Sequence, residues 1–133
     1  MDYLEEKYAQ LLQAMQAWQR ALEAPFSDIS RDASIQRYEF SFELLWKVIK
    51  KYLKEIEGFE RNSPKACFRE IRMTLDISEE DIEICMSMIE DRNLSVHTYS
   101  EEMAMVLYNK LPEYLRVSNV IAEKIKVKAG LGK

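Results

Sequence analysis

The chain has 133 residues, 47% of them hydrophobic and 32% charged, with a formal net charge of −4 at pH 7. This balance is typical of a globular domain with a hydrophobic core, and it excludes a disordered chain. The negative net charge argues against broad, charge-driven binding of nucleic acid, which requires several clustered Lys and Arg side chains.

The composition and the lack of recognisable targeting signals predict a cytoplasmic, all-α protein. No apolar run approaches the roughly 18 residues of a membrane span, and the N-terminus lacks the regions of a signal peptide. Only three Gly and three Pro interrupt the chain, so long helices are favoured over many short strands. Cys67 and Cys85 have no CxxC spacing and only one His is present. We therefore expect no metal, no cofactor and two buried thiols in a reducing compartment.

Apolar residues at alternating steps of four and three predict a first helix over about residues 2–23. They are Leu4, Tyr8, Leu11, Met15, Trp18 and Leu22. Pro25 ends this helix, and Asp28 or Ser30 is a candidate N-cap for the next one. The second helix is predicted over about residues 31–57, with Gly58 as a left-handed C-cap.

The second helix has a second apolar stripe, which points away from its main one. The residues of this stripe are Phe40, Leu44 and Val48. A single bundle core cannot bury both stripes. Two explanations remain open: a helix or loop of the same chain covers the second stripe, or the stripe forms a dimer or partner-protein interface.

Four lysines lie between these two stripes, namely Lys47, Lys50, Lys51 and Lys54. Glu43 lies four residues before the first of them, a spacing typical of an ion pair on a helix surface. A solvated face is the simpler interpretation of this pattern. A shallow phosphate-binding surface is the alternative.

Three further helix starts follow, each with a serine as the expected N-cap: Ser63 before Pro64, Ser78 and Ser100. The fifth helix is expected to kink or split at Pro112 and to end near residue 126. The predicted architecture is therefore a four-helix up-and-down bundle with an extra short helix. It forms a single domain over residues 1–126, followed by a frayed tail over residues 127–133.

The only His lies between the fourth and fifth predicted helices, close to an Arg and a Tyr. His97 can exchange a proton near neutral pH, and Arg92 can stabilise a developing phosphorane. This pairing suits metal-independent RNA cleavage, in which the 2′-hydroxyl attacks its own phosphate. One imidazole cannot easily act as both acid and base, so two copies meeting across a dimer are expected. The alternative is structural: Arg92 pairs with Glu90 or Asp91, His97 forms a hydrogen bond with a helix end, and Tyr99 packs under the loop.

Two segments of the sequence resemble a known family. Residues 92–99 resemble the RxxxxHxY motif of the HepT-like branch of the HEPN superfamily. Residues 31–47 resemble the second-helix signature of nucleotidyltransferase substrate-binding proteins, and Ser63-Pro64 lies where that family has it. The resemblance covers roughly residues 3–126.

The resemblance implies a homodimeric helical bundle that works with a minimal nucleotidyltransferase as a toxin–antitoxin-like pair. The resemblance also implies that Arg92 and His97 of two protomers form the RNA-cleaving site, and that Asn93 is the polar residue after the Arg. Tyr99 is the residue that the nucleotidyltransferase would adenylylate to silence the toxin, because added phosphate and bulk beside His97 would exclude RNA. The alternative function is a non-catalytic substrate-binding subunit of a nucleotidyltransferase complex.

Overall fold

The computed structural model describes residues 3–97 and 100–131, without the side chains of residues 95–97. The described residues form the helices α1 (Tyr3–Glu23), α2 (Asp28–Tyr52), α3 (Pro64–Thr74), α4 (Glu79–His97) and α5 (Glu101–Ala129). A π-helical turn, Leu53–Glu57, extends α2. The all-α prediction is confirmed.

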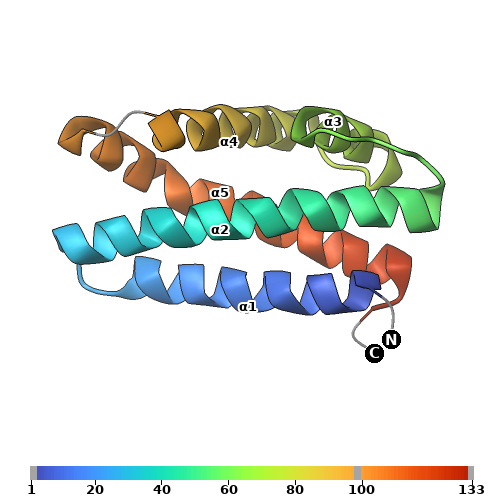
Figure 1. Cartoon of the computed structure of the whole chain (residues 1–133), viewed down its shortest axis with the longest axis horizontal. Helices are drawn as coiled ribbons and strands as arrows, with labels where there is room; N and C mark the ends of the chain where they lie inside the picture. Colours follow the sequence, from blue (N-terminus) through green and yellow to red (C-terminus); the bar gives the residue numbers. More distant parts are fainter. Residues whose placement is uncertain (1–2, 98–99, 132–133) are drawn as a thin grey trace.

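The four long helices alternate in direction, and α3 is the short addition (Figure 1). α1 and α4 lie on opposite sides of α2, and α5 crosses behind α2 (Figure 1). α2 packs against α1, α3, α4 and α5. The predicted four-helix up-and-down bundle with an extra short helix is therefore the observed arrangement.

The N-cap of α2 differs from the prediction. Ser27 is the N-cap, and its Oγ accepts a hydrogen bond from the backbone N–H of Ser30 at 3.0 Å. The Ser30 hydroxyl in turn accepts from the Ser27 N–H at 2.9 Å, which completes a capping box. Asp28 is thus the first helical residue and not the cap, and α2 begins three residues before the expected start.

The three serine N-caps and the Gly58 C-cap that the sequence predicts are confirmed. The hydroxyls of Ser63, Ser78 and Ser100 accept hydrogen bonds from the backbone N–H three residues later at 3.1–3.2 Å. Gly58 has a φ of 80°, the left-handed conformation that favours glycine after a helix.

The core is organised around Tyr38 of α2, which is fully buried. Its ring lies 5.6 Å from that of Trp18 in α1 and 5.6 Å from that of Tyr114 in α5. Its hydroxyl donates a hydrogen bond of 2.6 Å to the carbonyl of Met88 in α4. One side chain therefore contacts all the other long helices.

The second apolar stripe of α2 is mostly covered by the chain itself. Leu44 is only 8% exposed and Val48 is fully buried in the core cluster. Interface roles for Leu44 and Val48 are thus wrong, because the packed helices bury both sides of α2. Phe40 is 58% exposed, and its role at a partner surface stays a prediction.

The lysines of α2 behave as a solvated, locally paired face. Lys51 contacts Glu55 at 3.1 Å, and the Lys50 ammonium lies 5.9 Å from the Trp46 ring. Glu43 does not show the expected pairing with Lys47 within the described residues, because it turns towards α4 instead.

Helix α5 differs from the prediction at two places. It runs without interruption through Pro112, so the expected split is wrong. Pro112 is exposed, where water can satisfy a freed carbonyl.

The helix ends at Ala129, not near residue 126, with Gly130 as a left-handed C-cap. Leu131 is buried, and its N–H donates to the Lys126 carbonyl at 2.9 Å. Residues 127–131 are thus not a frayed tail, because packing and capping hold them; residues 132–133 lie outside the described part.

Among the described residues, no helix is long and apolar enough to cross a membrane.

Candidate functional site: the cleft between α2 and α4

Residues 92–97 of the predicted motif lie within a helix, not in a connection between helices. α4 continues to His97, so Arg92 and Asn93 belong to its last turns. His97 is four residues after Asn93, hence one helical turn further on, but its side chain is outside the described part. Tyr99 also lies outside the described residues.

Arg92 spans the boundary between α4 and α2. Its side chain is 23% exposed, and its Nε lies 3.7 Å from Oε2 of Glu43. The other Glu43 oxygen accepts a hydrogen bond of 3.3 Å from the Trp46 indole. Glu43 is therefore the observed carboxylate partner of Arg92, in place of Glu90 or Asp91. The Arg92 guanidinium therefore lies at the α2–α4 boundary.

Asp91, the residue before Arg92, faces α5 instead of α2. Its carboxylate accepts a hydrogen bond from the Tyr114 hydroxyl and contacts the Lys110 ammonium at 3.2 Å. The Tyr114 hydroxyl also lies 2.6 Å from Oγ of Ser87. Burial, and then the neighbouring Asp91, raise the pKa of Tyr114, so the phenol stays protonated. These contacts fix the C-terminal half of α4 against α5.

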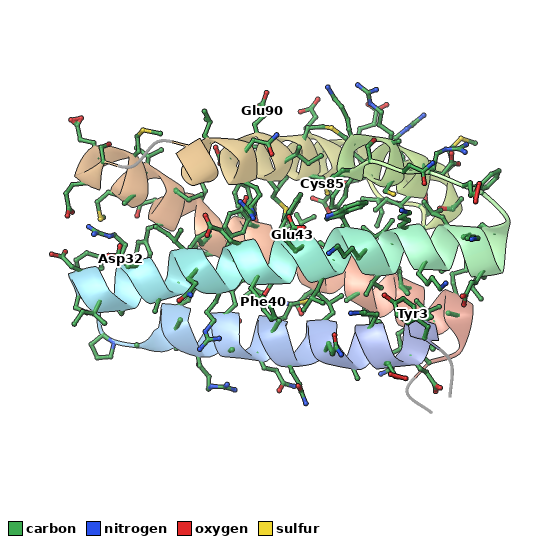
Figure 2. The ribbon with its side chains drawn as sticks, in the orientation of Figure 1. Tyr3, Asp32, Phe40, Glu43, Cys85 and Glu90 are labelled. Atoms are coloured by element: carbon green, nitrogen blue, oxygen red, sulfur yellow. The ribbon has the colours of Figure 1, made fainter. Side chains whose placement is uncertain are left out.

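A cavity of about 610 Å³, here called the α2–α4 cleft, opens beside Arg92. Its lining residues are Phe42, Glu43, Ser63, Pro64, Lys65, Met86, Ile89, Glu90, Arg92 and Asn93. Glu43 lies between α2 and α4, whereas Glu90 points away from α2 (Figure 2). The cleft thus combines cationic and amide donors with carboxylates and an apolar wall. Its volume lies within the range of small-molecule sites.

A second cavity of about 370 Å³, the α4–α5 groove, lies on the Asp91 side of α4. Its apolar lining comes from Ile35, Leu94, Met103, Ala104, Val106 and Leu107. Leu94 and Val106 are more than half exposed, so this groove presents apolar surface to solvent.

The remaining reactive groups do not contribute to the cleft. Cys67 and Cys85 are buried and free, and burial raises the pKa of Cys67 to about 11 and that of Cys85 to about 12. They are therefore protonated and unreactive at neutral pH. The part of the chain that the structure describes contains no cluster of three or more His, Cys, Asp or Glu able to hold a metal ion.

Sequence reasoning did not place two polar residues, Glu43 and Lys65, beside Arg92. Glu43 has a closer candidate partner in sequence, Lys47, and only the packing of α4 on α2 reveals its contact with Arg92. Lys65 comes to the cleft through the start of α3. In the sequence, Lys65 with Arg69 and Arg72 indicated at most a shallow phosphate-binding surface. The Ser63-Pro64 helix start fixes the local structure of Lys65 but not its neighbours.

The fold and the cleft define a helical-bundle protein with a preformed ligand-sized site. The chain belongs to the family described as nucleotidyltransferase substrate binding protein like, whose model matches residues 2–127. It is also similar to a protein of Thermus thermophilus of known crystal structure. The two share 33% identity and a TM-score of 0.82, over 87% of this chain and 98% of that one. No match was found among curated proteins.

Proposed function

We propose that this chain is the partner subunit of a minimal nucleotidyltransferase and that it cleaves RNA, without metal, in the α2–α4 cleft. The observation that supports this most is the position of Arg92 and Asn93 at a cavity large enough for a nucleotide. A guanidinium and an amide there can both donate hydrogen bonds to phosphate oxygens. His97, one helical turn beyond Asn93, supplies the proton-transfer group.

In the proposed reaction the 2′-oxygen forms a bond to phosphorus while the bond from phosphorus to the 5′-oxygen breaks. Arg92 neutralises the charge that develops on the phosphorane, and His97 protonates the leaving 5′-oxygen. The products are a 2′,3′-cyclic phosphate and a 5′-hydroxyl. The proton of the 2′-hydroxyl goes to a base, for which the His97 of a second copy is the proposed group.

The test is cleavage of RNA by the purified protein in EDTA, with analysis of the product ends. Wild type is expected to yield 2′,3′-cyclic phosphates, and His97→Ala to lose this activity by about 10²–10⁴-fold. Arg20→Ala is the matched surface control, because Arg20 is an exposed residue of α1, on the far side of α2 (Figure 1). Wild-type products no more abundant than those of His97→Ala would overturn the proposal.

We also propose that two copies associate through the α4–α5 groove. Val106 is 58% exposed at the groove, with Glu102 four residues before it and Lys110 four residues after it. An antiparallel pairing of two α5 helices about Val106 would place Glu102 of each copy opposite Lys110 of the other. Such a surface is self-complementary, as a two-fold dimer requires.

Val106→Glu is expected to convert the dimer to a monomer, because it places two carboxylates at the centre of the interface. Light scattering after size-exclusion chromatography measures the mass. Met73→Glu is the control, since Met73 is an equally apolar and strongly exposed residue of α3. A wild-type monomer, or a Val106→Glu dimer, would contradict the assignment.

Adenylylation of Tyr99 is the proposed means by which the nucleotidyltransferase silences the cleavage. The modification adds a charged phosphate and a bulky nucleoside two residues after His97. Incubation with the partner enzyme and ATP should add the mass of AMP to wild type and abolish cleavage. Tyr99→Phe should stay unmodified and active; its modification at another residue would overturn this role.

A non-catalytic substrate-binding subunit is the second candidate function. The family description supports it, and so does a cleft that is already formed within one chain. In this case the protein co-purifies with the nucleotidyltransferase and cleaves nothing. Phe40→Glu is the informative interface variant, because Phe40 is exposed; Leu44→Glu would instead put a charge into the core.

A further inference from the structure

We infer that the α2–α4 cleft binds one whole nucleotide of the RNA and prefers guanine, which it recognises through the carboxylate of Glu90. The inference rests on the proposed binding of RNA at this cleft, but not on its cleavage. Three properties of the cleft support it: its length, its apolar wall and a carboxylate without a partner among the described residues.

The cleft is too long for a phosphate group alone. Met86, Glu90 and Asn93 line it from successive turns of α4. The seven residue-to-residue steps from Met86 to Asn93 correspond to a rise of about 10 Å along the helix axis. With a phosphate bound by Arg92 and Asn93, the remaining length reaches towards Met86 and Lys65, which gives room for a ribose and a base.

One wall of this remaining part is apolar. Pro64, Met86 and Ile89 line it and are each partly exposed, so their surfaces are accessible to a ligand. A phosphate gains nothing from such a wall, whereas the flat face of a base can pack against it. Single-stranded RNA is generally recognised through unstacked bases that pack on side chains and form hydrogen bonds through their edges.

The two carboxylates of the cleft differ in whether other side chains already contact them. Both oxygens of Glu43 have neighbours, since one accepts from Trp46 and the other lies near Arg92. Glu90 is exposed and forms no hydrogen bond or ion pair within the described residues. It points away from α2 (Figure 2), which places it at the outer edge of the cleft. Glu90 is therefore the carboxylate with both oxygens available to a ligand.

An ionised carboxylate only accepts hydrogen bonds. Guanine presents two adjacent donors, N1–H and the 2-amino group, on its Watson–Crick edge, and these match the two oxygens of Glu90. Adenine and cytosine present one amino group beside an acceptor nitrogen, and uracil presents one N–H between two carbonyls. Guanine is thus the base that a free carboxylate at this position favours.

The test is the binding of 2′-deoxy dinucleotides, which the chain cannot cleave, measured by titration calorimetry for dGpT, dApT, dCpT and dTpT. Wild type is expected to bind dGpT at least about fivefold more tightly than the others. Glu90→Gln should lose this preference, because an amide presents one donor and one acceptor. Met86→Ala should weaken all four by a similar factor.

Glu83→Gln is the matched control, because Glu83 is an exposed residue two turns before Glu90 on the same side of α4 and does not line the cleft. It should keep the guanine preference. Equal binding of the four dinucleotides, a preference that survives in Glu90→Gln, or no binding would overturn the inference. Guanine-selective binding without RNA cleavage would overturn only the proposed ribonuclease, whereas cleavage without base preference would overturn only the inference.

Discussion

Replacing Tyr38 by alanine is expected to lower the free energy of unfolding by about 3–5 kcal/mol. The side chain is fully buried and contacts Trp18 and Tyr114, so its removal leaves a cavity where three helices meet. The hydrogen bond to the Met88 carbonyl is lost as well. Urea unfolding followed by circular dichroism measures the change through the shift of the midpoint at a constant slope.

Tyr38→Phe separates the two contributions. It keeps the ring and removes only the hydroxyl, so a loss of about 1 kcal/mol is expected. Phe26→Ala is the control for an aromatic residue outside the core, because Phe26 is exposed, and it should change stability by less than Tyr38→Ala. A Tyr38→Ala protein as stable as Tyr38→Phe would show that the ring does not hold the helices together.

Arg92→Ala is expected to reduce the rate constant of RNA cleavage by about 10²–10³-fold, the usual effect of removing a group that stabilises developing charge. Its ion pair with Glu43 is partly exposed, so stability should fall by about 1 kcal/mol or less. Single-turnover cleavage of a labelled RNA, alongside urea unfolding of the same preparations, separates the two effects. A loss of activity that follows a loss of structure would contradict the role.

Arg92→Lys distinguishes charge from geometry at the same position. Lysine keeps the positive charge but cannot form two parallel hydrogen bonds to a phosphate. We expect cleavage by Arg92→Lys to lie between that of wild type and Arg92→Ala. Glu43→Gln removes the carboxylate partner of Arg92 and tests whether this contact holds the guanidinium in place; unchanged cleavage by Glu43→Gln would show that it does not.

Local signals in the sequence were sufficient for much of the fold. The helix starts at Ser63, Ser78 and Ser100 and the left-handed Gly58 depend on a few neighbouring residues, and the structure shows each of them. The end of α5 was mispredicted because burial of Leu131 is a tertiary contact that no local pattern reports.

For the candidate site too, some features follow from the sequence and others only from the tertiary structure. The sequence by itself determined the presence of a single His near an Arg, the all-α class and the similarity of the motif to that of a known family. Only the tertiary structure decided that Leu44 and Val48 are core residues, because it shows what packs on each side of α2. It also decided that Glu43 and Lys65 join Arg92 at one cleft. Local helical geometry is fixed by neighbours in the chain, whereas the composition of a cleft depends on which helices pack together.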